Sequence, residues 1–141
     1  RPLFGERTCW WVRPELDCEK MQKASEGLIG RHDFAAYRSR SKQERDDTVR
    51  TLHQISVLRH GSSVSIQVVG DGFLYRMVRN LVGVLVEVGR GLRDVDDPTR
   101  ILASTDRQQA GFAAPAPGLF LMEVACRGEP LPQCLEQPMT L

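Results

Sequence analysis

The feature that most constrains the fold is a predicted helix that is apolar on almost every side. Between residues 73 and 88 apolar side chains recur at helical spacing, and Met77 and Val84 widen the stripe formed by Leu74, Val78, Leu81, Leu85 and Val88. The helix should start after 71–72 (DG) and stop at the glycines of 89–91 (GRG). So little polar surface predicts a central helix with other elements packed around it.

An arginine interrupts this apolar surface. Tyr75, Arg79 and Gly83 share the remaining narrow face at helical spacing, with Arg76 beside them. A guanidinium does not lose its proton, so in such a place it needs a carboxylate or a phosphate to offset its desolvation. Two interpretations stay open. Arg79 pairs with a carboxylate of this chain, or it faces an interface and pairs with an acidic group supplied from outside.

Length and composition predict one globular domain. The chain has 141 residues, of which 41% are hydrophobic and 26% charged. Its net charge of +1 does not by itself indicate a nucleic-acid partner. It contains no run of about 18 apolar residues, so no membrane association is expected. Arg1 is not a natural first residue, so we expect an upstream portion to be missing. The expected location is intracellular, cytoplasmic by default, with an organelle or the nucleus left open.

The cysteines do not have the spacing of a metal site. No C-x-x-C pair occurs among them, and the chain has only three histidines as possible co-ligands; the cysteines are Cys9, Cys18, Cys126 and Cys134. We therefore expect free thiols in a reducing compartment rather than disulfides, and no zinc.

Hydrophobic periodicity predicts an α+β fold, an antiparallel β-sheet with helices packed on one face. One helix should follow Asp17 as N-cap, bury Met21, Ala24 and Leu28, and end at Gly30. Alternation at 49–57 and 64–68 predicts a hairpin with one buried face, turning at 59–62.

The rest of the chain gives weaker signals. A short helix should open at 97–98 (DP) and run to about 105, residues 10–12 and 119–125 are strand candidates, and 39–47 is a polar, exposed loop. We assign residues 1–127 to one domain and 128–141 to a loosely ordered tail.

The chain carries no nucleophile motif, P-loop, close carboxylate pair or dinucleotide-binding glycine pattern. The remaining candidates are arginines and one lysine. One group lies in or next to the polar loop and is typical of solvated surface: Arg38, Arg40, Lys42 and Arg45. The other group, Arg90 and Arg93, follows the central helix and complements its dipole.

Residues 73–83 (FLYRMVRNLVG), followed by 85–89 (LVEVG), closely resemble the signature helix of the TruA-type tRNA pseudouridine synthases. Other segments occur in that family's order and spacing: 16–17 (LD) with Met21 and Ala24, 30–34 (GRHDF) with Arg38, 49–51 (VRT), and 114–119 (APAPGL). The resemblance covers about residues 2–124. One departure is 46–50 (DDTVR), which replaces the usual Ser/Thr-Pro before Val-Arg, so the local turn need not match the family's. The basic residues in 39–45 need not bind tRNA as their counterparts do.

The resemblance implies an enzyme that isomerises uridine to pseudouridine in the anticodon arm of tRNA, without cofactor or metal. The family's nucleophilic aspartate lies in an Arg-Thr-Asp-x-Gly-Val-His-like motif that this sequence lacks, and Asp106 stands in the wrong context. The chain would therefore be the C-terminal half of such an enzyme and inactive alone. Its partners would be tRNA and the missing N-terminal half, in an enzyme that is typically a homodimer.

The resemblance also implies roles for single residues. Arg79 matches the arginine that pairs with the catalytic aspartate across the cleft between the halves, and Leu119 matches a leucine that lines the uracil pocket. For Leu119 the interpretation as a core strand residue also stays open. The residues expected on the cleft side, in contact with RNA, are Tyr75, Arg76, Met77 and Asn80. Two alternatives remain: a non-catalytic RNA-binding or assembly domain with the same fold, and a structural domain with an internal Arg79 ion pair.

Overall fold

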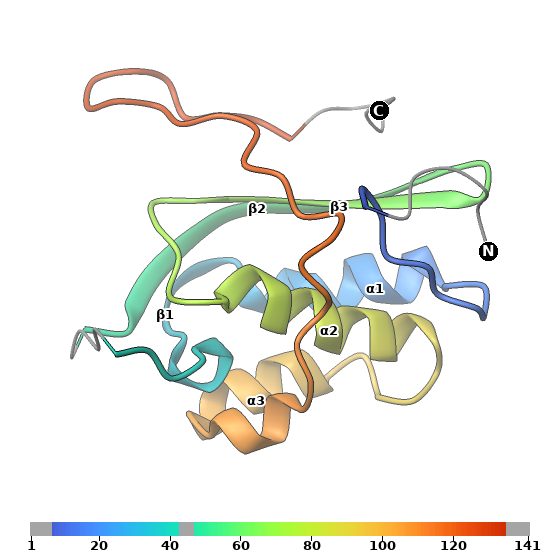
Figure 1. Cartoon of the computed structure of the whole chain (residues 1–141). Helices are drawn as coiled ribbons and strands as arrows, with labels where there is room; N and C mark the ends of the chain where they lie inside the picture. The colour runs from blue at the N-terminus through green and yellow to red at the C-terminus, as the bar shows by residue number, and fades with distance from the viewer. Residues whose placement is uncertain (1–6, 43–46, 135–141) are drawn as a thin grey trace.

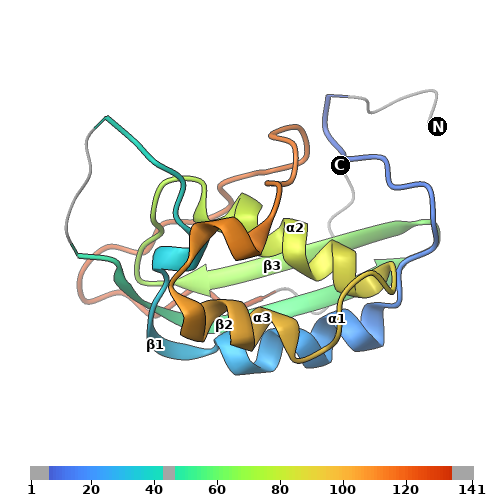
Figure 2. The same cartoon turned by 90° about the horizontal axis from the view of Figure 1, so that it is seen from below.

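The computed structural model describes residues 7–42 and 47–134, built around a three-stranded antiparallel sheet (Figures 1 and 2). The strands lie in the order β1 (Gly30–Asp33), β2 (Val49–His60), β3 (Ser63–Gly70). The α-helices are α1 (Cys18–Ser25), α2 (Met77–Gly89) and α3 (Asp97–Ser104), and the 3-10 turns are η1 (Glu26–Leu28), η2 (Ala35–Tyr37) and η3 (Arg107–Ala110). All three α-helices lie on one side of the sheet (Figure 1). The predicted α+β class is confirmed.

The core lies between the sheet and the helices. Ile55 and Val57 of β2 pair with Val68 and Ile66 of β3, so these four side chains share the face turned toward the helices. Helix α2 supplies the largest set of buried residues, including Met77, Leu81, Val84, Leu85, Val86 and Val88. The helix predicted to be apolar on nearly every side is therefore the element around which the others pack.

The predicted hairpin is confirmed, with one change of register. Strands β2 and β3 meet at Gly61 and Ser62, inside the predicted turn. The ladder shifts between Leu52 and Gln54, and the buried residue at this end is Leu52 rather than Thr51 or His53. An extra residue in one strand moves every side chain beyond it to the other face, so simple alternation is wrong for this end of β2.

Helix α1 begins as predicted and ends early. The Asp17 carboxylate accepts a hydrogen bond from the Lys20 N–H at 3.1 Å, and the predicted apolar face is buried. The helix stops at Ser25 and tightens into η1, so Gly30 is not its C-cap. With a φ of +106°, Gly30 instead opens β1, a strand that the sequence analysis did not predict.

The central helix begins at Met77, four residues later than predicted. Arg76 precedes it in the left-handed region, with φ of 56° and ψ of 15°, so residues 73–76 are not helical. Its end at Gly89 is as predicted. Helix α3 is also shifted: Asp96 is its N-cap, and the Asp97 carboxylate inside the helix accepts from the Asp94 N–H at 2.9 Å.

The two outer strand predictions are wrong. Residues 10–12 and 119–125 have no regular structure, because neither pairs with a strand among the described residues. The C-terminal segment passes to the side of the sheet opposite the helices (Figure 1). There Cys134 N–H donates to the Gln54 side chain at 3.0 Å, so this part of the predicted tail contacts the hairpin. Residues 43–46, which include Arg45, and 135–141 lie outside the described residues.

Two further properties follow from the described residues. All four cysteines are free thiols, as expected. None of the helices in the described part of the chain is long and apolar enough to cross a membrane.

Gly83 lets the backbone of Phe112 approach α2 closely, and a substitution at Gly83 tests this packing. A Cβ added there would lie 2.5 Å from the carbonyl oxygen of Phe112. In a helix interior, alanine is normally more favourable than glycine by about 1 kcal/mol. We nevertheless expect Gly83→Ala to lower the free energy of unfolding by about 1–3 kcal/mol, because the backbone of Phe112 has to move. Urea denaturation measures this.

The matched control is Gly72→Ala, where the added Cβ would meet only the Arg50 side chain at 3.8 Å. Its stability should stay within about 0.5 kcal/mol of the unmodified chain. A Gly83→Ala variant as stable as this control would contradict the close contact between α2 and residue 112.

Candidate functional site

Arg79 is held at a fixed position by the chain segment that leaves η3. The Ala114 N–H donates to the Arg79 carbonyl at 2.9 Å, and the Arg79 Nε–H donates to the Ala114 carbonyl at 2.7 Å. Gly83, one turn further along α2, allows the segment to cross the helix closely enough for both bonds. The half-buried guanidinium is thereby aimed in one direction. Its two terminal nitrogens have no hydrogen bond to residues 7–42 or 47–134, so they are left for another acceptor.

None of the ion pairs within residues 7–42 and 47–134 includes Arg79. Arg79 therefore has no carboxylate partner in the described part of the chain, as an internal salt bridge would require. A neutral carbonyl offsets only part of the cost of burying a cation. The geometry leaves Arg79 suited to an anion that approaches from outside.

Tyr75 and Arg76 form an exposed platform before α2. The guanidinium carbon of Arg76 lies 5.0 Å from the centre of the Tyr75 ring, within the range of a cation–π contact. The Ser39 N–H fixes the peptide of Tyr75 by donating to its carbonyl at 3.1 Å. Because Tyr75 precedes the helix, it does not share a helical face with Arg79, contrary to the prediction. The left-handed backbone of Arg76 costs about 1–2 kcal/mol, and such strain gathers at functional sites.

Met77 and Asn80 do not lie at the surface. Both side chains are fully buried in this chain, whereas a residue predicted to contact RNA is expected to be exposed. Asn80 Nδ2 donates to the Tyr37 carbonyl at 2.6 Å and to Ser39 Oγ at 3.2 Å, while its Oδ1 accepts from Arg107 Nη2 at 3.0 Å. The side chain next to Arg79 is thus a buried junction between three segments.

Leu119 is exposed rather than part of a core strand. About half of its surface is accessible (51%), and its N–H donates to the Ala116 carbonyl at 3.1 Å in a turn. The apolar residues that follow are also exposed, namely Phe120, Leu121, Met122 and Val124. A run of this kind on a surface is typical of a segment that meets another molecule or domain.

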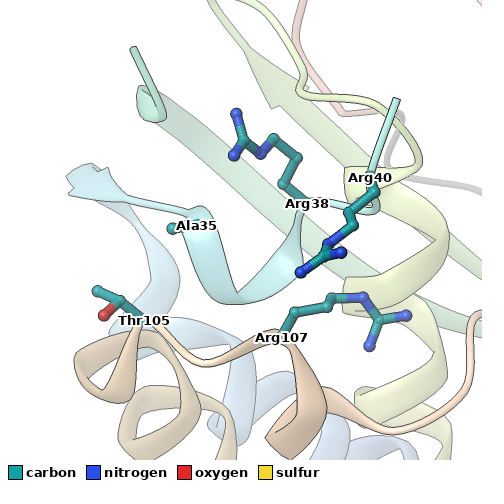
Figure 3. Close-up of a pocket in the computed structure, with 5 residues that line it drawn as sticks. All are labelled: Ala35, Arg38, Arg40, Thr105 and Arg107. Carbon is teal, nitrogen blue, oxygen red and sulfur yellow. The ribbon is translucent and has the colours of Figure 1, made fainter. Parts of the chain in front are cut away.

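Arg107 was not among the site residues predicted from the sequence. Its Nη1 donates to the Gly111 carbonyl at 2.7 Å and its Nη2 to Asn80. It lines a hollow of about 390 Å³ together with Ala35, Arg38, Arg40 and Thr105 (Figure 3). The end of η2 and the segment after it therefore contribute two arginines, Arg38 and Arg40, to a shared site. Arg79 does not line this hollow. No local sequence motif predicts the hollow, because its two walls are about 65 residues apart in sequence.

Two other groups in this region have structural roles. Arg93 forms an ion pair with Glu87 and donates to the Gln109 carbonyl at 3.0 Å, which ties η3 to the end of α2. Tyr37 donates its hydroxyl to the Pro98 carbonyl at 2.7 Å, and burial raises the pKa of this phenol well above its ordinary value. Tyr37 therefore stays neutral and anchors η2 to α3.

Asn80 should be one of the most sensitive positions in the chain. Asn80→Ala leaves the buried Tyr37 carbonyl and the half-buried Ser39 hydroxyl and Arg107 Nη2 without these hydrogen bonds. We expect the free energy of unfolding to fall by about 2–4 kcal/mol, measured by urea or thermal denaturation. Gln109→Ala, at an exposed amide of η3, serves as the control and should change stability by less than about 0.5 kcal/mol. Equal effects of the two substitutions would show that the junction does not stabilise the fold.

Most of the chain is similar to known proteins. Residues 24–125 match the family model described as tRNA pseudouridine synthase. The chain is 46% identical over 127 residues to tRNA pseudouridine synthase A 2 of Clostridium tetani, covering 88% of this chain and 51% of that protein. It is 45% identical over 122 residues to tRNA pseudouridine synthase A of Brevibacillus brevis, covering 86% of this chain and 50% of that protein. The chain spans about half the length of these curated relatives.

Proposed function

Because the chain belongs to the tRNA pseudouridine synthase family, of the TruA type, we propose that it is the C-terminal half of an enzyme that isomerises uridine to pseudouridine in tRNA. The observation that carries the proposal is Arg79, a cation with a fixed direction and no carboxylate partner in the described part of the chain. The anticodon arm is the proposed target region. The N-terminal half of the same enzyme and a second copy of the enzyme are the proposed protein partners.

The proposed reaction exchanges one bond of the nucleoside for another. A carboxylate nucleophile supports cleavage of the C1′–N1 glycosidic bond, and the base then rejoins the ribose through C5. The C5 proton leaves and N1 gains one, so the product is an isomer of the substrate. This chain carries no such nucleophile in the family's motif, so the aspartate has to come from the other half.

In this mechanism Arg79 acts on that aspartate. An opposite charge at ion-pair distance lowers the pKa of a carboxyl group and keeps it ionised, as a nucleophile requires. The hydrogen bond from Nε to the Ala114 carbonyl leaves the terminal nitrogens to form a two-bonded pair with the carboxylate. Arg79 therefore positions and charges the nucleophile.

Exposed side chains on the two chain segments that adjoin Arg79 suit a base that has left its stack. A target nucleotide has to be extruded to react, and an aromatic or apolar surface compensates the lost stacking. Exposed Tyr75 and Leu119 offer such surfaces, and Arg76 is a cation that can reach phosphate oxygens. Buried Met77 and Asn80 have an indirect role here, since they hold the start of α2 in place.

The isolated chain should not form pseudouridine. We expect no turnover above background when it is incubated with a tRNA transcript, and turnover when the complete two-half enzyme is used. Release of label from C5-tritiated uridine measures the reaction. Circular dichroism of the isolated chain checks that it is folded. Robust turnover by the isolated chain would refute the division of labour between the halves.

Replacement of Arg79 tests its role directly. In the complete enzyme Arg79→Ala should lower kcat by about 10²–10³-fold, by analogy with the loss of one preorganised charged or polar group at a reacting centre. The aspartate pKa should rise without its partner, so the acidic limb of the rate profile should move to higher pH.

Two controls separate this role from a structural one. Arg79→Lys keeps the charge and should restore part of both the rate and the pH profile, although it loses the forked geometry. Unfolding curves should show that both variants are folded. A rate near that of the unmodified enzyme for Arg79→Ala, or an unmoved pH profile with a reduced rate, would contradict the ion-pair role.

A further inference from the structure

Two arginines from distant parts of the chain face each other across one hollow. Arg40 follows η2 and Arg107 opens η3, and both line the hollow of about 390 Å³. In Figure 3 the side chain of Arg40 extends toward that of Arg107 beside α2, whereas the guanidinium of Arg38 points away from both. Ala35 and Thr105 line the other end of the hollow. Two like charges in one concave site repel each other unless an anion lies between them.

The side chain of Arg107 is held in place by hydrogen bonds, whereas that of Arg40 is not. The Arg107 guanidinium is held by two neutral acceptors, the Gly111 carbonyl at 2.7 Å and Asn80 Oδ1 at 3.0 Å. No ion pair among the described residues involves either arginine. Exposed Arg40 has no hydrogen bond to a described residue. One donor group is thus preorganised, and the other is available to close on a ligand.

Buried Asn80 connects both walls of the hollow to the start of α2. Its Oδ1 holds Arg107, and its Nδ2 holds Tyr37 and Ser39, which lead directly into Arg40. Thr105 at the rim is in the left-handed region with φ of 54°, a strained conformation for a β-branched residue. The walls are therefore fixed relative to the turn of α2 that carries Arg79.

We propose that Arg40 and Arg107 bind a backbone phosphate of the RNA substrate. This proposal rests on the proposed function. A phosphodiester presents oxygens in several directions and accepts from two guanidinium groups on different walls, which a planar carboxylate does less well. The link through Asn80 to the helix of Arg79 favours an RNA strand over a free anion. Contacts of this kind position a nucleic acid without reading its sequence.

Arg40→Gln is the decisive variant, because Arg40 has no hydrogen bond or ion pair to a described residue, so its loss should leave the fold intact. We expect the affinity of the 141-residue chain for a single-stranded RNA oligonucleotide, measured by fluorescence anisotropy, to fall about tenfold, as for one lost charge-assisted hydrogen bond. The slope of log K against log salt should become shallower by about 0.7, the value for one phosphate contact on a single strand. Arg40→Lys should restore the slope.

The matched control is Arg90→Gln, which removes the same charge from an exposed position ten residues from Asn80 along α2, about 15 Å away. It should bind like the unmodified chain. Equal losses in the two variants would overturn the proposal in favour of a diffuse charge effect, and an unchanged Arg40→Gln variant would overturn it directly. Failure of the unmodified chain to bind RNA would do the same.

A second arm identifies the source of the phosphate. Inorganic phosphate is titrated into the unmodified chain and Arg40→Gln, with the arginine side-chain resonances as readout. Saturable phosphate binding through Arg40, combined with RNA affinity that does not depend on Arg40, would assign the hollow to a small anion and overturn the RNA proposal.

Activity of the complete enzyme separates this proposal from the proposed function. Arg40→Gln should raise KM for tRNA about tenfold with kcat unchanged, as expected for a contact made equally before and during reaction. Absence of pseudouridine formation by the unmodified enzyme would refute the proposed function, whereas the binding measurements would still decide the phosphate site.

Discussion

The buried amide of Asn80 is the interaction on which the arrangement of this chain depends. One side chain satisfies the Tyr37 carbonyl, the Ser39 hydroxyl and the Arg107 guanidinium, so the η2 segment and the η3 segment both meet a single residue of α2. A fully buried amide is tolerated only when its donors and acceptor are all paired, because each unpaired group costs about 1–3 kcal/mol. The same requirement that keeps Asn80 satisfied therefore fixes the segments on either side of Arg79.

The start of α2 shows how that junction shapes the surface. A helix that began at residue 73 would carry Tyr75 and Arg76 in its first turn. Instead Arg76 takes a left-handed conformation, and the Tyr75 carbonyl bonds the Ser39 N–H next to the Asn80 junction. The strain at Arg76 is offset by this packing and by the contacts of buried Met77. The outcome is an exposed aromatic ring and two arginines at one end of an otherwise apolar helix.

Local periodicity in the sequence was enough to predict the elements that bury one face. The hairpin, the Asp17 cap and the apolar α2 all follow from spacing within a few residues. The features that were missed depend on distant partners. The Asn80 amide bonds residues 43 and 27 positions away, and the bulge at His53 is invisible to alternation. Residues 10–12 and 119–125 have strand-like sequences, but a strand also needs a neighbour with which to pair. Side-chain patterns carry no information about that neighbour.

The placement of Arg79 explains why a half-buried cation suits the proposed role better than an exposed one. Its Nε bond to Ala114 removes most of the rotational freedom that a long side chain would otherwise lose on pairing. Its partial burial excludes water from one side, which strengthens an ion pair formed there without the full penalty of desolvating an isolated charge. An exposed arginine would pair weakly, and a fully buried one would need its carboxylate for the chain to fold. Arg79 lies between these limits, so a carboxylate that arrives with another domain can be held ionised and in a fixed direction while this chain remains folded.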